Sequence, residues 1–493
     1  MNILVESRNK ANVSGAALLW SGLFILSGIG AAVISSIVLF ELLDFWVLLM
    51  VPAFFSLAFF LLVDISDWLV LLMAFFMPLF TQLSVKVAGV VNLDWWDGII
   101  ILIVGRRLFL WGLLALRGNL KIRFSALHIY LLLFLFSYGL SFAGSANLVI
   151  SVGALAKIIM SYGIFWFFLF KIPNQQHVKR FTTLLLLAGL FVATIGIFQQ
   201  ATGQDVTIDQ FKALVKQGVE EVQRAGIYST FRESLLVGGY LGWVLPIAVS
   251  LAFCPGLSWT ESSFYRLTAI AVLLALVFSQ SRGAYAMGGI SLLTLLYFNR
   301  IRIVKLLRHK TMLILWPVFP LSLIVLSIGV YFVYPGILDR ILSVLVVIVP
   351  SLKEQGGETM AYGVSSSLHR ILAMSAAWKA FQGSPLYGIG AGTFKEVVGY
   401  SWAHNSYLHV LTERGIIGLL TYLLLLWGIE RRLYHWRRNT SLPYWQALSI
   451  GVYAAFIGVI TGGSFNSAET IVQVAFYMWF YTRVAQKMLG CVV

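Results

Sequence analysis

The sequence predicts an all-α fold, a polytopic bundle of about 12–14 membrane-spanning helices. Hydrophobic residues make up 59% of the 493 residues and charged residues only 11%, and the mean hydropathy is +0.88. Soluble domains carry roughly 25% charged residues, so this composition excludes an ordinary soluble protein. Apolar runs of about 20 residues, the length that crosses a bilayer, also recur along the whole chain.

About fourteen candidate spans follow one another, as counted from hydropathy. They lie near residues 16–40, 44–63, 66–82, 95–116, 125–143, 148–170, 180–200, 234–253, 264–280, 284–298, 311–334, 405–428, 446–463 and 468–486. The first run is too long for the core of a signal peptide, and no small-residue cleavage pattern follows it, so we expect a retained span. The second to fourth runs are the least regular, because Asp64, Asp67, Arg106 and Arg107 interrupt them.

Positive charge is concentrated in short loops between the apolar runs, and the net charge is +15. The basic residues of these loops are Arg117, Lys121 and Arg123; Lys171, Lys179 and Arg180; Arg300, Arg302, Lys305, Arg308 and Lys310; and Arg431, Arg432, Arg437 and Arg438. An even number of membrane crossings separates each basic cluster from the next, so all of the clusters lie on the same side of the membrane. This is the positive-inside pattern, in which basic loops are cytoplasmic. The charge therefore indicates that both termini are cytoplasmic, and it requires no nucleic-acid partner.

Two long segments are expected outside the membrane, near residues 202–233 and 335–403. The expected divisions of the chain are 1–334 with the first eleven spans, 335–404 with the large extracytoplasmic loop, and 405–493 with the C-terminal spans. Loops longer than about 15 residues are usually functional or disordered. Within the larger loop, residues 365–381 show apolar residues at helical spacing, which predicts a helix along the membrane surface.

A cluster of ionisable residues at 403–420 marks the most informative part of the chain. His404, Asn405, Glu413 and Arg414 lie at the mouth of an otherwise apolar helix. Placing ionisable residues at the edge of a membrane span costs free energy, so such a cluster indicates a functional site. The ordinary pKa of histidine, about 6.5, suits removal of a hydroxyl proton near neutral pH. We therefore favour His404 as a general base over a structural role.

His409 has a different expected role. It lies five residues after His404, about 140° around the helix and roughly 7.5 Å deeper, so the two histidines do not easily share one task. His409 and Glu413 are spaced i,i+4, which favours a structural pair.

Several arginines map to the outer side, against the positive-inside rule. They are Arg224, Arg282, Arg370 and Arg414, and Lys379 accompanies them. One interpretation is snorkelling or pairing with nearby glutamates. The other is an anion held at the bilayer surface. A guanidinium matches phosphate oxygens with two parallel hydrogen bonds, so an arginine cluster is typical of a diphosphate site.

The sequence predicts no cofactor and no metal. The Gly-rich run GIGAG at 388–392 does not follow a strand of a βαβ unit, so it is very weak as a nucleotide motif. Cys254 and Cys491 both map to the inner side, where a disulfide is improbable, and no Cys/His cluster has zinc spacing.

Five motifs together resemble the O-antigen ligase and polysaccharide polymerase family. They are GLFVATIGIFQQATGQ at 189–204, RAGIYSTFRESLLVGGYL at 224–241, SRGAY at 281–285, HRILAMSAAWKAFQGSPLYGIGAGTF at 369–394 and HNSYLHVLTERGIIGLL at 404–420. Their order, spacing and expected side of the membrane agree over roughly residues 180–430, although Ser-Thr-Phe-Arg replaces the family's usual Asn-Pro-rich turn. The first hundred residues carry no such resemblance.

The resemblance implies a metal-independent glycosyltransferase of the membrane-embedded C type (GT-C-like) in the bacterial inner membrane. Its donor is an undecaprenyl-diphosphate-linked oligosaccharide, and its active site faces the periplasm or exterior. By the same resemblance, Arg224 and Arg282 hold the diphosphate and Arg370 is a weaker candidate. His404 is the general base or orients the acceptor. Asn405 and Arg414 complete the expected substrate-binding set.

Three functions remain open at this point. A polymerase passes the glycan to a lipid-linked repeat and can work with a chain-length regulator, and the extra N-terminal spans favour it slightly. A ligase passes the glycan to lipid A–core, and some relatives glycosylate proteins. A flippase of lipid-linked oligosaccharides is the alternative of another class. A transporter should show inverted repeats and a midplane polar site, whereas the polar residues here gather at the outer surface.

Overall fold

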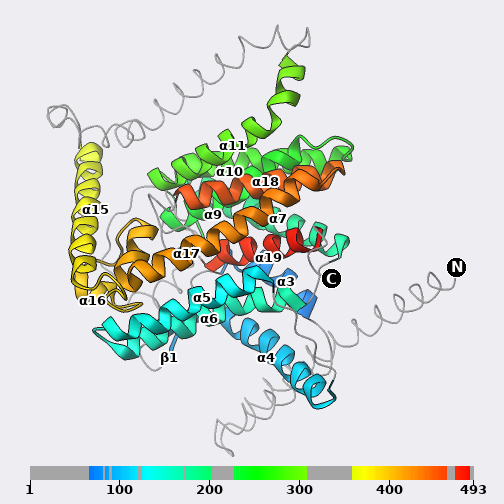
Figure 1. Cartoon of the computed structure of the whole chain (residues 1–493). Coiled ribbons are helices and arrows are strands. Elements are labelled where there is room, and N and C mark those ends of the chain that lie inside the picture. Colours follow the sequence, from blue (N-terminus) through cyan, green and yellow to red (C-terminus); the bar gives the residue numbers. More distant parts are fainter. Residues whose placement is uncertain are drawn as a thin grey trace, which may run out of the picture. The chain divides into compact units, whose positions relative to one another are not determined.

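The structure is a computed structural model, and Figure 1 shows its fold. It describes residues 66–80, 84–87, 91–118, 125–170, 174–202, 227, 229–231, 234–307, 358–462 and 472–488. The expected spans near 16–40, 44–63 and 311–334, together with Arg224 and Cys491, lie outside these residues. The chain divides into two compact units, residues 1–69 with 105–118, and residues 70–104 with 119–493. The second unit holds nearly all of the described helices.

The described elements confirm the all-α polytopic prediction. The helices are α3 (Ser66–Phe76), α4 (Trp95–Leu116), α5 (Ala126–Leu140), η1 (Ser141–Gly144), α6 (Leu148–Phe170), α7 (Gln175–Thr202), α9 (Ser234–Ala252), α10 (Trp259–Phe278), α11 (Arg282–Leu307), α15 (Glu358–Gly383), α16 (Phe394–Val398), α17 (Ser406–Asn439), α18 (Pro443–Gly462) and α19 (Val472–Met488). Within the described residues, seven helical stretches are long and apolar enough to cross a membrane. They are α4, α5 with η1, α7, α9, α10, α17 and α18.

Several predicted boundaries differ from the structure, and the differences at α3 and α17 have clear physical causes. The span expected at 66–82 ends at Phe76, because Pro78 cannot continue a helix. A small antiparallel hairpin follows, in which β1 (Ser84–Val87) pairs with β2 (Val91–Asp94). The span expected at 405–428 is one longer helix, α17, which continues through its basic end to Asn439.

One half of the second unit is built around α9. This helix packs against α7, α10, α11 and α18, and its Tyr240 and Trp243 are fully buried. Small residues let the helices approach closely, as is common in membrane bundles. A Cβ at Gly458 of α18 would collide with Ser291 and Met287 of α11. In the other half, α17 packs against α5 and α19, and α19 packs against α6.

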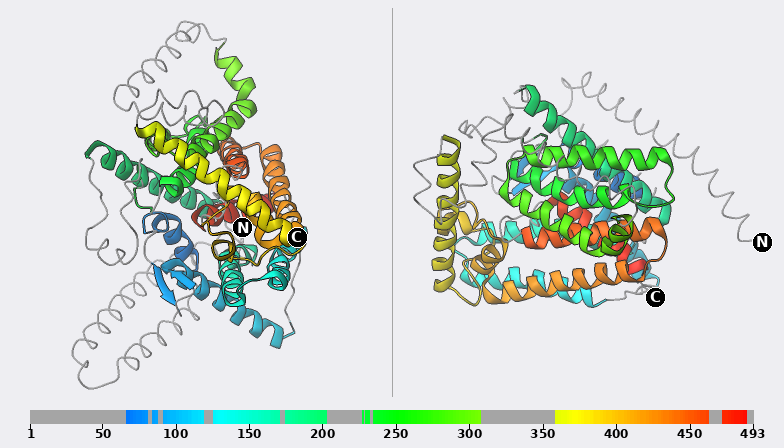
Figure 2. Two further views of the ribbon diagram at one scale, coloured as in Figure 1. Left: turned by 90° about the vertical axis from the view of Figure 1, so that its left-hand side faces the viewer. Right: turned by 90° about the horizontal axis from the view of Figure 1, so that it is seen from above.

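Helix α15 has a different direction from the bundle. It runs across one end of the bundle and crosses the direction of α17 and α18, as two views show (Figures 1 and 2). It contains the helix predicted at 365–381. Its Ala373 and Ala377 are fully buried, whereas Leu368, Ile371, Leu372 and Trp378 are exposed. The functional candidates gather at this end of the bundle.

Candidate active site

His404 closes the short loop that connects α16 to α17. Its backbone has a φ of 54°, in the left-handed region that few residues other than glycine adopt. The next residue, Asn405, caps α17, because its side-chain oxygen accepts a hydrogen bond of 2.9 Å from the Leu408 N–H. Left-handed residues are concentrated at functional sites, where the surrounding structure holds them in place. The cap and the backbone turn together fix the direction of the His404 side chain.

His369 and Arg370 lie near the half-buried His404 imidazole, and Tyr400 lies next to His369. The ring of His369, from α15, lies 6.1 Å from it between centroids, and the ring of Tyr400 lies 5.1 Å beyond His369. Arg370 adds a positive charge to this group. Burial, and then the charges of Arg370 and His369, lower the pKa of His404 to about 4. At neutral pH the imidazole is therefore uncharged and able to accept a proton.

We expect an acid limb near pH 4 in the pH profile of kcat/KM. His404 becomes protonated as the pH falls through its pKa, so base catalysis holds down to about pH 5 and is lost below. An ordinary histidine would lose activity near pH 6.5. Arg370→Gln removes one cause of the low pKa, so the acid limb should move upward. Lys379→Gln, on the same helix, is the control. Initial transfer rates in vesicles between pH 4 and 8 measure both effects, and an unmoved limb in Arg370→Gln would contradict the assignment.

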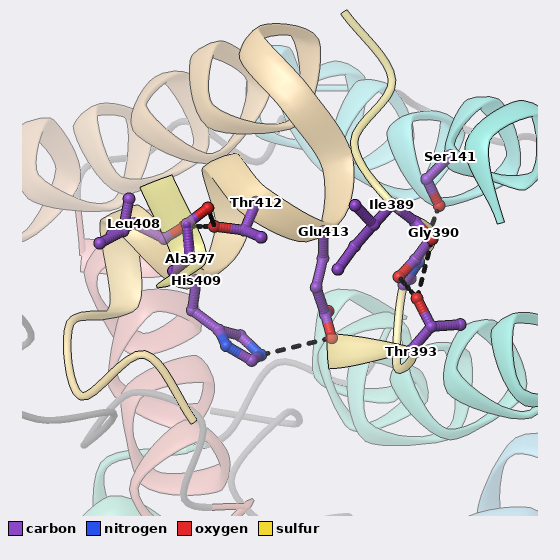
Figure 3. A network of polar contacts seen from close by, with 10 residues as sticks. Ser141, Ala377, Ile389, Gly390, Thr393, Leu408, His409, Thr412 and Glu413 are labelled. Carbon is purple, nitrogen blue, oxygen red and sulfur yellow. Dashed lines mark hydrogen bonds and ion pairs between the residues drawn. The ribbon is translucent and has the colours of Figure 1, made fainter. Parts of the chain in front are cut away.

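Three contacting rings, those of Phe394, His409 and Trp402, support the His404 loop. His409 lies between Phe394 and Trp402, with both centroid distances at 4.6 Å. Its Nε2 lies 3.5 Å from Glu413 Oε1, which confirms the predicted i,i+4 pair (Figure 3). Since Trp402 lies two residues before His404, this pair braces the loop that carries the candidate base.

Helix α17 is broken at Gly415, and the segment after α15 forms hydrogen bonds with the backbone groups that the break leaves without helical partners. Gly415 has a φ of 66° and a ψ of −167°, so the local helical hydrogen bonds are lost. Extended backbone replaces them: Ile416 N donates to Pro385 O (2.9 Å), Ile389 N to Thr412 O (3.0 Å) and Gly390 N to Glu413 O (3.1 Å). Figure 3 shows Ile389 and Gly390 beside this part of the helix. Broken membrane helices are tolerated only where such partners satisfy the backbone.

Glycine makes this contact possible at two positions. A Cβ at Gly388 would collide with the backbone of Glu413 and Arg414, and a Cβ at Gly415 would collide with the carbonyl of Leu386. Both glycines have positive φ. The GIGAG run therefore packs its backbone directly against the backbone of α17. This is a structural role for the run, which was a very weak nucleotide motif.

Arg414 lies inside the bundle and not in the surface group around His404. It is only 4% exposed. Its guanidinium carbon lies 4.5 Å from the Phe134 ring and 4.3 Å from the Tyr138 ring, both on α5. This is cation–π packing between helices. The structure thus separates Arg414 from the other expected substrate-binding residues.

Arg282 is the first residue of α11 and is partly buried. Gln280, just before it, has a φ of 49°, and the Ser281 hydroxyl accepts a hydrogen bond from Ala284 N. These contacts fix the point at which α11 begins. The sequence placed Arg282 between two spans, and the structure agrees.

The segment after Arg224 is held by a residue that the sequence did not single out. Gln199 of α7 accepts a hydrogen bond of 2.9 Å from Ser229 N, and Ser229 Oγ donates to Val192 O. Ile227 N donates to Phe278 O at the end of α10. Ile227 therefore lies next to the α10–α11 turn that carries Arg282, whereas Arg224 lies outside the described residues. In the sequence, Gln199 was noted only as part of the family-like motif at 189–204.

Contacts with α18 place Arg282 and His404 at the same end of the bundle. The Tyr407 hydroxyl, three residues after His404, donates to Ile460 O near the end of α18. A Cβ at Gly462, the last residue of α18, would lie 3.1 Å from Cβ of Met287, in the second turn of α11. The starts of α11 and α17 therefore adjoin the end of α18. In the described part of the chain, no three His, Cys, Asp or Glu side chains form a metal-binding group.

One part of the chain matches a known protein family. Residues 267–423 match the family model described as O-antigen ligase (Wzy_C). The match covers α10, α11, α15, α16 and the first half of α17, and it includes Arg282, Arg370, His404, Asn405 and Arg414. None of the curated proteins matches the chain.

Proposed function

We propose that the protein is a membrane glycosyltransferase acting as a polysaccharide polymerase, because residues 267–423 match the family model described as O-antigen ligase. Its donor is an undecaprenyl-diphosphate-linked glycan, and its acceptor is a sugar hydroxyl of a lipid-linked repeat. The protein is a multi-pass membrane protein. We place it in the bacterial inner membrane, with both termini cytoplasmic and with His404 and Arg282 on the outer side.

The observation that carries this proposal is the state of His404. A half-buried, neutral imidazole stands at the mouth of a helix, beside Arg370 and at the same bundle end as Arg282. A neutral histidine removes a proton from a hydroxyl, and an arginine binds a diphosphate. Transfer of a glycan from a lipid diphosphate to a hydroxyl group requires both of these functions.

The proposed reaction is a single displacement. His404 accepts the proton of the acceptor hydroxyl, and that oxygen forms a bond to the anomeric carbon of the donor glycan. The bond from this carbon to the diphosphate oxygen breaks, and the lipid diphosphate leaves with the bonding electrons. Arg224 and Arg282 stabilise the charge that develops on the leaving group. Arg370 keeps His404 neutral, and Asn405 fixes the helix start that orients it.

A ligase is the second candidate, because the matched family model carries that description. In that case the acceptor is lipid A–core, or a protein in the case of an O-oligosaccharyltransferase. The chemistry at His404 is the same, and only the acceptor differs.

Deletion of the gene in its host tests the proposal and separates the candidates. Lipid-linked glycan should accumulate in either case. Loss of polymerase leaves single repeat units on the final acceptor, whereas loss of ligase leaves full-length polymer on the lipid carrier. Gel analysis of the envelope glycans, with mass spectrometry of extracted lipid diphosphates, distinguishes the two. Unchanged glycans and no accumulation would refute both.

A further inference from the structure

Three polar aromatic rings form a row at the outer end of the bundle. The rings of Tyr400 and His369 have centroids 5.1 Å apart with an interplanar angle of 66°, and those of His369 and His404 are 6.1 Å apart at 69°. The middle ring belongs to α15, whereas the outer two belong to the loop before α17. Contacts between two chain segments thus create the row.

The row is accessible. His369 is exposed, and Tyr400 and His404 are partly buried. Behind it, the fully buried Ala377, Phe394 and Ala403 pack together and hold the loop against α15. Because the residues behind it are packed and all three rings are at least partly exposed, the row is a fixed surface that a ligand can contact.

The chemistry of the row suits a neutral, polyhydroxylated ligand. A neutral imidazole has one N–H donor and one nitrogen acceptor, and a tyrosine hydroxyl both donates and accepts. Sugar hydroxyls have the same dual character, and the C–H groups of a sugar ring make weak contacts with aromatic rings. The charge for a diphosphate lies elsewhere, at Arg282 on α11.

We infer that His369 and Tyr400 form, beside His404, a binding subsite for the sugar ring of the acceptor glycan. The inference rests on the proposed function and deepens it. A general base lies within about 2.6–3.2 Å of the hydroxyl that it deprotonates. The sugar that carries this hydroxyl therefore lies beside His404, where the nearest described ring is that of His369, and the Tyr400 ring lies next to His369. This reasoning assigns the subsite to the acceptor and not to the donor.

Acceptor titration tests the subsite. Purified protein in phospholipid vesicles receives a fixed amount of radiolabelled lipid-linked glycan, extracted from cells carrying His404→Ala. The envelope glycolipid extract of a deletion strain, unlabelled, is the acceptor series. His369→Ala and Tyr400→Phe should raise the half-saturating acceptor concentration about three- to tenfold, as expected for the loss of one or two hydrogen bonds. The maximal rate should stay within about twofold of the wild type.

Tyr387→Phe is the matched control, because Tyr387 is also an exposed tyrosine of the outer segment and makes no described ring contact with the row. It should leave acceptor saturation unchanged. If His369 only tunes the charge of His404, His369→Ala would move the pH profile and leave acceptor saturation unchanged, which would overturn the inference. Unchanged saturation in both variants, with normal transfer by the wild type, would do the same. If the wild type itself transfers no glycan, the proposed function fails first.

A photo-crosslinking amino acid at position 369 or 400 provides a second readout that does not depend on rate. Irradiated cells should yield a glycan adduct on the protein, detected by glycan staining and mass spectrometry, and the same amino acid at position 387 should not. Equal adducts at all three positions, or none at 369 and 400, would contradict the subsite.

Discussion

His404→Ala should reduce glycan transfer by about 10²–10⁴-fold, the usual cost of removing a general base. Protein level and membrane insertion should stay normal, because His404 is a half-buried loop residue whose backbone is held by the Asn405 cap and the packed Ala403. Lipid-linked donor should accumulate in the cells. The measurements are immunoblots of membrane fractions, analysis of envelope glycans and quantification of extracted lipid diphosphates.

His435→Ala is the control for this variant, since His435 lies on the same helix, α17, at its other end. It should transfer glycan normally. Near-normal transfer by His404→Ala would return His404 to a structural role and remove the proposed base.

Arg282→Ala should be the second most damaging change. Loss of one partner of a desolvated charge pair costs about 2–5 kcal/mol, or roughly 30-fold or more in donor use. Arg282→Lys keeps the charge but loses the planar fork that matches two phosphate oxygens, so it should still weaken donor use by on the order of tenfold. Both variants should accumulate lipid-linked donor without loss of protein.

Arg300 supplies the matched control for these substitutions. It lies on α11 as well, at the basic end, and its guanidinium packs over the Tyr297 ring. Arg300→Lys and Arg300→Ala should not impair donor use. If Arg282 is instead a structural pair, Lys will largely restore function, and Ala will lower the amount of folded protein.

Hydropathy predicted some helices to the residue. The expected spans at 95–116 and 148–170 coincide with α4 and α6. Both are nearly continuous apolar runs with polar flanks, so length and composition decide their ends. Hydropathy failed at Pro78, where a local backbone constraint ends α3, and it could not foresee a hairpin of only two short strands.

The broken helix at Gly415 shows why the site itself was harder to predict. The run at 405–428 has the pattern of a single span, and α17 does follow it. The break depends on hydrogen bonds that Ile389 N and Gly390 N donate to α17 and that Pro385 O accepts from it, and these residues are distant in sequence. The i,i+4 pair of His409 with Glu413 is local, and its prediction was correct.

The same distinction between local and distant contacts explains which features around His404 could be predicted from the sequence. Its position at a helix mouth and the Asn405 cap follow from adjacent residues. No local pattern in the sequence connects His369 with His404, because it is the packing of α15 against the loop that brings the two rings together. Arg414, which the sequence placed among the anion-binding residues, is enclosed by tertiary packing against Phe134 and Tyr138.

The most direct measurement is glycan transfer by the purified protein in vesicles that contain only lipid-linked glycan donor and acceptor. The account predicts a new glycosidic bond and one released lipid diphosphate for each transfer, with both lost in His404→Ala while donor binding is retained. Movement of intact lipid-linked glycan across the bilayer without bond formation would contradict it and identify a transporter. Normal transfer by His404→Ala would contradict the assigned site.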